Sequence, residues 1–95
     1  MKQYEIMFIL NPNLDNDNLK KIVKVLEKSL TDNKATITLS KELGQKEFAY
    51  EINKHKTGYY YLYNIETKTN DAVKEFDRIA RINENVIRHL IIKEN

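Results

Sequence analysis

Residue types able to carry out chemistry are few in this chain, and their spacing brings none of them together. The 95 residues include no cysteine, which excludes disulfides, thiolate nucleophiles and thiolate metal sites. The two histidines, His55 and His89, lie far apart and lack the short spacing that places two imidazoles on one helix face. Asp15 and Asp17 form a close pair of carboxylates, but they stand where a helix begins and are explained as capping residues. We therefore expect no catalytic residue, no metal site and no cofactor.

Phosphate and acyl-transfer chemistry is also disfavoured, because the chain has no glycine-rich phosphate loop and no G-x-S-x-G motif. Lysines and arginines number 16 against 14 acidic residues, a net charge of +2 that permits contact with a nucleic acid without requiring it. No segment approaches the ~18 consecutive apolar residues of a membrane span. A strand pattern that begins almost at Met1 leaves no room for a signal peptide. These features predict a non-enzymatic, cytoplasmic protein with no membrane association and no small-molecule substrate.

The elements that position the remaining polar residues can be predicted from the periodicity of the apolar ones. Residues 4–10 alternate between apolar faces in the manner of a β-strand, and the Asn-Pro-Asn segment at 11–13 ends it. Asp15 or Asn16 caps a helix, and Asn33 is suited to the left-handed conformation at its end. The apolar stripe of this helix is Leu19, Ile22, Val23, Leu26 and Leu30.

The second part of the chain gives a similar series of patterns. They predict a strand over 35–40, renewed alternation over 48–52, a polar loop over 54–58, a tyrosine-rich strand over 59–66, a helix from 69–71 to a break at 83–85, and a final strand over 86–92. Inward-facing residues of that helix are Val73, Phe76, Ile79 and Ala80. Gly44 is either a hairpin turn or a bulge that bends one long strand, and the residues alone leave both possibilities open.

With Gly44 as a bulge, the order of elements is β-α-β-β-α-β, an α+β ferredoxin-like domain over residues 1–95. It has a four-stranded antiparallel sheet with two helices on one face. The predicted core consists of Ile6, Phe8, Leu26, Leu30, Tyr61, Ile65 and Phe76. Two helices cover one face only, yet several strands are apolar on both, which indicates that a protein partner covers the other face. The residues predicted to form that partner face are Met7, Ile9, Tyr60 and Leu62.

Five segments in order and in register give the chain a resemblance to the ribosomal protein S6 family of the bacterial small subunit. They are YEIMFILNPNLD at 4–15, ELG at 42–44, FAYEINK at 48–54, GYYYLYNIE at 58–66 and INENVIRHLII at 82–92. The resemblance implies the ferredoxin-like fold with Gly44 as a bulge. It also implies a non-enzymatic role in the ribosome, in which the protein pairs with ribosomal protein S18 and both bind the central domain of 16S ribosomal RNA.

Matched by position, the family's RNA contacts correspond to Lys2, Tyr4, Lys54 and Arg88. The chain departs from the family's usual sequence at one of these positions and at one residue near another. Lys2 replaces an arginine and loses the planar fork that binds a phosphate with two donors. Glu51 replaces a proline and adds a negative charge three residues before Lys54.

Two other binding functions remain as alternatives to the family's role. One is a module like the RNA recognition motif, which stacks bases on aromatic residues of its third strand; residues 56–63 imitate that motif loosely, but Tyr60 stands where it has a small residue. The other is an interaction domain that uses the apolar face for protein alone.

Overall fold

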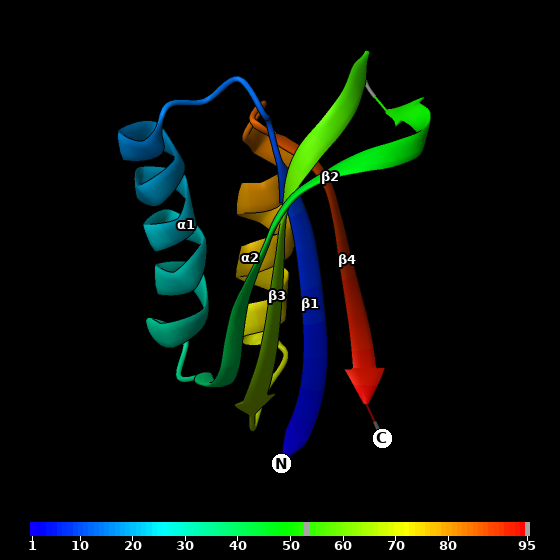
Figure 1. Ribbon diagram of the computed structural model, residues 1–95. Coiled ribbons are helices and arrows are strands. Elements are labelled where there is room, and N and C mark those ends of the chain that lie inside the picture. Colours follow the sequence, from blue (N-terminus) through cyan, green and yellow to red (C-terminus); the bar gives the residue numbers. More distant parts are fainter. Residues whose placement is uncertain (53, 95) are drawn as a thin grey trace.

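The computed structural model describes residues 1–52 and 54–94, and it has six elements in the predicted order. They are β1 (Lys2–Leu10), α1 (Asn16–Thr31), β2 (Thr36–Ile52), β3 (His55–Thr67), α2 (Asp71–Ile82) and β4 (Val86–Glu94). The strands form one antiparallel sheet in the order β2-β3-β1-β4. Both helices pack on the same face of that sheet, which leaves the other face open (Figure 1). The predicted ferredoxin-like arrangement is confirmed.

Local signals at the helix ends explain where α1 begins and ends. The Asp15 carboxylate accepts a hydrogen bond from the Asn18 backbone N–H at 2.8 Å and caps the helix, as predicted. At the other end the left-handed residue is Lys34, with φ of +67°, and not Asn33. The Asn33 side chain instead donates to the Ser29 carbonyl at 2.8 Å, so it satisfies an orphan carbonyl of the last turn by its amide rather than by its backbone.

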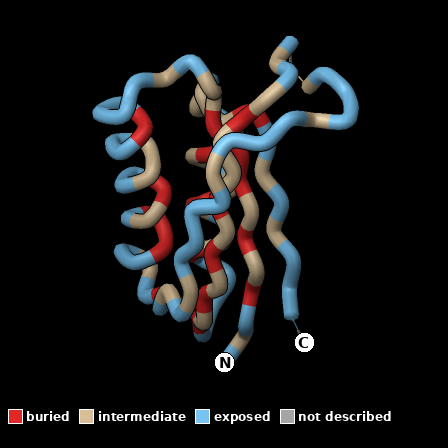
Figure 2. Tube along the Cα trace, in the orientation of Figure 1, coloured by how far each residue is buried: buried red, intermediate tan, exposed pale blue. Residues whose placement is uncertain are grey.

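The hydrophobic core lies between the helices and one face of the sheet, where alternate residues of β1 and β3 are buried (Figure 2). Phe8 is at its centre, stacked on Tyr61 with ring centroids 5.0 Å apart and tilted against Phe76 at 5.8 Å. All seven residues of the predicted core are buried in this cluster. Burial of large apolar side chains on a single face of each strand fixes the pairing register, since a slip by one residue would expose them all.

The β2–β3 hairpin departs from the predicted element boundaries. The register of β2 against β3 shifts between Glu42 and Gly44, and Gly44 has φ of +83°, so it lies at a bulge in one long strand. The polar loop predicted over 54–58 is wrong, because β3 already begins at His55. Lys54 makes the tight turn with φ of +66°. The result is a long bent hairpin that reaches over the open face toward β4 (Figure 1).

Candidate nucleic-acid and protein interface

The open face of the sheet carries a band of apolar side chains across three strands. Cross-strand neighbours in an antiparallel sheet point to the same face, and Met7 of β1 lies between Leu62 of β3 and Leu90 of β4. Leu90 and Ile92 are 48% and 46% exposed, while Met7 and Leu62 are partly exposed. Sequence reasoning identified Met7 and Leu62 but missed the two β4 residues, because either parity of that strand is apolar. Of the residues in this band, Met7 and Leu62 belong to the predicted partner face.

Ile9 is a different case, because the chain itself covers this residue and leaves it 5% exposed. Its side chain packs against Gly58 of β3 so closely that a Cβ on Gly58 would overlap Ile9 Cγ2 and stand 2.9 Å from Phe48 Cζ. Tyr60, the cross-strand neighbour of Ile9, lies against the Phe48 ring with centroids 6.0 Å apart. The bent hairpin therefore packs over one end of the open face.

Under this hairpin lies a hollow of about 330 Å³, lined by Met7, Ile9, Ile52, Tyr60, Arg88, His89 and Leu90. Arg88, the cross-strand neighbour of Ile9, is exposed. Within the described chain its side chain makes no salt bridge and no side-chain hydrogen bond. Lys54 is exposed in the hairpin turn. Two of the four predicted RNA-contact residues thus lie at the hairpin end of the sheet.

The other two, Lys2 and Tyr4, lie near the opposite end of β1, ~20 Å from Ile9 at the usual rise of a strand. Lys2 Nζ and the Tyr4 hydroxyl both donate to Asn70 Oδ1, at 3.1 and 2.9 Å. Tyr4 is 8% exposed and belongs to the core. Because its oxygen is used in this way, Asn70 makes no side-chain cap on α2. The four residues therefore form two separate pairs and not one cluster.

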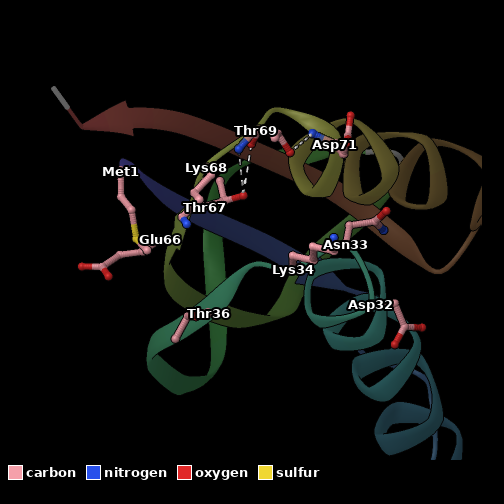
Figure 3. A pocket seen from close by; sticks show the side chains of 10 residues that line it. All are labelled: Met1, Asp32, Asn33, Lys34, Thr36, Glu66, Thr67, Lys68, Thr69 and Asp71. Carbon is pink, nitrogen blue, oxygen red and sulfur yellow. Dashed lines mark hydrogen bonds between the residues drawn. The ribbon is translucent and has the colours of Figure 1, made fainter.

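The Lys2 end also holds a hollow of about 540 Å³, between the end of α1 and the start of α2 (Figure 3). Its lining mixes the basic side chains of Lys34 and Lys68 with the acidic ones of Asp32, Glu66 and Asp71. Such mixed charge offers no net preference for an anion. No periodic signal in the sequence could have grouped these residues, because they come from separate turns and strand ends.

Ionisable groups buried in the core have structural roles. Burial raises the pKa of the Tyr61 phenol to about 12. The pKa of Tyr63 is raised further, first by burial and then by the hydrogen bond that its hydroxyl donates to Glu27 Oε1 at 2.5 Å.

The two histidines lie in different places. His89 Nε2 lies 2.8 Å from Asp77 Oδ1 of α2, and its ring meets Phe76 edge-on. His55 is on β3 at the hairpin turn, away from this contact. The two histidines are not brought together.

Within residues 1–52 and 54–94, no group of three or more histidine, aspartate or glutamate side chains is placed to hold a metal ion. None of the helices in the described chain is long and apolar enough to cross a membrane.

Comparison with known proteins gives a consistent result over the whole length. Residues 3–93 match the family described as ribosomal protein S6. The chain belongs to the ribosomal protein S6 family. It is 54% identical over 94 residues to the small ribosomal subunit protein bS6 of Phytoplasma australiense, and the match covers 99% of this chain and 100% of that protein. It is 46% identical over 94 residues to the bS6 protein of Shouchella clausii (strain KSM-K16), where the match covers 99% of this chain and 98% of that protein.

The fold agrees with that of a solved S6 protein. The crystal structure of 30S ribosomal protein S6 from Thermotoga maritima superposes with a TM-score of 0.93 at 26% sequence identity, covering 98% of this chain and 87% of that one. The S6 family is structural and not enzymatic, and its members are components of the small ribosomal subunit. The chain is therefore a structural protein of the small ribosomal subunit, and the prediction of a non-enzymatic role is confirmed.

Proposed function

We propose that this S6-family protein, acting in the cytoplasm as one domain, binds the central domain of 16S ribosomal RNA jointly with ribosomal protein S18 during small-subunit assembly. The observation that carries the proposal is the open face of the sheet. It combines an exposed apolar band with an exposed arginine that has no side-chain partner within the described residues. The two features suit two different partners, a protein and a nucleic acid.

The protein partner is assigned to the apolar band. Met7, Leu62, Leu90 and Ile92 are adjacent on three strands, and covering them removes apolar surface from water. Ile9 and Tyr60 offer this partner less exposed area, because the hairpin already covers Ile9 and Phe48 packs against Tyr60. Their role is to support and shape the contact surface.

The RNA partner is assigned to the two pairs of predicted contact residues. Arg88 and Lys54 offer charged donors at the hairpin end, and Arg88 supplies a planar fork for a phosphate. At the other end, the Lys2 ammonium group and the Tyr4 hydroxyl both donate to Asn70 Oδ1. Tyr4 therefore helps to hold Asn70 and Lys2 in place and does not stack on a base. Such contacts fix the orientation of RNA without reading its sequence.

A module like the RNA recognition motif is less well supported. Tyr61 and Tyr63 are buried in the core. The Tyr60 ring contacts Phe48, and the Lys46 Nζ lies 5.8 Å from the Tyr60 ring centroid. An aromatic platform for bases needs free ring faces, and these rings are already in contact with the protein.

The test is to measure binding of the purified chain to a fragment of the 16S central domain, with and without S18 from the same organism. We expect S18 to strengthen binding of the chain to the RNA fragment. The fragment should strengthen binding of the chain to S18 by the same factor, because linkage is reciprocal. Equal RNA affinity with and without S18 would contradict joint binding. If the chain binds S18 tightly but has no affinity for the RNA fragment, the protein-only alternative is favoured.

A further inference from the structure

The helix α1 carries the whole net positive charge of the chain. Its 16 residues include two acidic residues and four lysines, Lys20, Lys21, Lys24 and Lys28, which gives this helix a net charge of +2. The complete chain has 16 basic and 14 acidic residues and the same net charge of +2. The 12 basic and 12 acidic residues outside α1 therefore cancel.

The four lysines share the side of α1 that faces away from the core. Leu19, Leu26 and Leu30 are buried against the rest of the core. At 3.6 residues per turn, the lysines occupy an arc of about 100° on the opposite side of the helix. All four are exposed, and so is most of the outer side of α1 (Figure 2). From Lys20 to Lys28 this face is ~12 Å long.

None of the four lysines forms a salt bridge within residues 1–52 and 54–94. Glu27, in the second half of α1, instead accepts a hydrogen bond from the Tyr63 hydroxyl. Asp17, the other acidic residue of the helix, lies in the first turn, where the helix dipole favours a carboxylate. The helix α2 differs, because Arg78 and Arg81 both pair with acidic residues of their own helix.

This arrangement of lysines disfavours the helix that carries it. Lys20, Lys24 and Lys28 follow one another at intervals of four residues, and like charges at that interval destabilise a helix. The negative end of the helix dipole compensates for Lys28 in the last turn, but not for Lys20 and Lys24. The paired charges on α2 serve solubility without this cost. A segment that departs from local stability rules in this way is expected at a functional site.

We propose that the outer face of α1 is a second RNA-binding surface. Its lysines, Lys20, Lys21, Lys24 and Lys28, bind phosphates of an RNA segment other than the one assigned to Arg88. Such binding needs charge and no base readout, and a lysine supplies a compact point charge. The lysines lie on the helix side of the molecule and Arg88 on the open side of the sheet (Figure 1). This contact goes beyond the proposed function, since neither S18 nor the central domain is needed for it.

An acidic protein or a membrane fits this face less well. Specific protein interfaces have an apolar centre and few lysines, whereas the apolar side chain beside these lysines, Val25, lies at their margin in the groove toward Ile79 of α2. An amphipathic helix binds a membrane through a free apolar side, but that side of α1 is buried in the core. RNA is also the polyanion of the small ribosomal subunit, to which the family belongs.

The experiment measures binding of the full chain to an RNA duplex of about 20 base pairs, unrelated in sequence to 16S RNA, by fluorescence anisotropy over a series of salt concentrations. Lys20→Gln with Lys24→Gln should weaken binding at least about tenfold at ~0.1 M salt, because two phosphate contacts are lost. The slope of log affinity against log salt should decrease by about two. The matched control, Lys74→Gln with Arg78→Gln, removes the same charge at the same interval from the exposed side of α2 and should change neither quantity.

Urea unfolding shows whether the lysine double variant keeps its fold. Its midpoint should be no lower than that of the unmodified chain, because the substitutions remove like-charge neighbours; a lower midpoint would contradict the charge repulsion on which the proposal stands.

Three binding results would overturn the proposal: no binding of the duplex by the unmodified chain, equal binding by the lysine double variant, or an equal loss in the control. Polyglutamate is the probe for an acidic protein, and loss of its binding without loss of RNA binding would assign the face to such a partner instead. Arg88→Ala tests the proposed function on the other side of the molecule, so the two can fail separately.

Discussion

Replacing Arg88 by alanine tests the proposed RNA contact at the hairpin end of the sheet. Arg88 is exposed on β4, opposite Ile9, and within the described chain it makes no salt bridge and no side-chain hydrogen bond. Its removal therefore breaks no polar contact among the described residues, and the free energy of unfolding should change by no more than ~0.5 kcal/mol. Any loss of binding then belongs to the interface.

The expected loss follows from the number of contacts that one guanidinium can make. A charge-assisted hydrogen bond to a phosphate contributes ~1.5–3 kcal/mol, which corresponds to a fall in affinity of about 10- to 150-fold at 25 °C. Because one fewer phosphate is neutralised, the slope of log affinity against log salt should also decrease by about one. Filter binding of the S18 complex to a central-domain fragment, over a series of salt concentrations, measures both quantities.

Arg78→Ala is the matched control, since it removes the same charge from an exposed site on α2, in the helix layer. We expect its affinity for RNA and its salt slope to equal those of the unmodified chain. Arg88→Lys keeps the charge but loses the fork, and should fall between the alanine variant and the unmodified chain. Unchanged affinity of Arg88→Ala at every salt concentration would refute the assignment, and an equal loss in Arg78→Ala would show that only net charge matters.

Other positions test the core, the hairpin and the apolar band. Leu26→Ala should cost ~2–5 kcal/mol in urea unfolding, because Leu26 is fully buried, and a cost below ~1 kcal/mol would contradict its place in the core. Leu62→Asp should leave the unfolding midpoint nearly unchanged and weaken S18 binding in calorimetry; loss of the fold would refute its place on the open face. Gly58→Ala should cost ~1–3 kcal/mol in the same urea assay, because the added Cβ overlaps Ile9, and no cost would show that the hairpin is not packed there. The pKa of Tyr63 is higher in the folded state than its unfolded value of about 10. The stability linked to this shift is therefore fully present below pH ~10. It is lost as the pH rises above ~10, by up to ~1.4 kcal/mol per pH unit. Urea unfolding from pH ~9 to ~11 should show a shallower decline for Tyr63→Phe, and an equal decline would contradict the shift.

Periodicity predicted most of the fold because each element has one buried face. The strand at 4–10 and the helix stripe through Leu26 and Leu30 were assigned correctly from spacing alone, since large apolar residues recur there with a single clear period. The final strand was located, but its exposed residues were not, because both parities of 86–92 are apolar. The period of the apolar residues identifies the buried face of a strand only where the two faces differ in polarity.

Features that depend on distant parts of the chain were not predictable. The polar composition of residues 54–58 suggested a loop, but pairing with β2 extends the strand to His55 and leaves only a tight turn. Burial of Ile9 requires the hairpin to bend at Gly44 and return over β1, which no local pattern encodes. The hydrogen bonds from Lys2 and Tyr4 to Asn70 join residues more than sixty positions apart.

The bent hairpin resolves a conflict between binding and solubility in this fold. A sheet with helices on one face must leave its other face apolar to bind a protein, yet an exposed apolar face promotes aggregation. Here the hairpin covers Ile9, and Phe48 packs against Tyr60. Arg88 and Glu94 of β4 place charge on either side of the remaining band. Gly58 makes this possible, because a Cβ there would overlap the side chains of Ile9 and Phe48 that pack against it. The absence of a side chain at Gly58 therefore helps to limit the apolar surface that this face exposes.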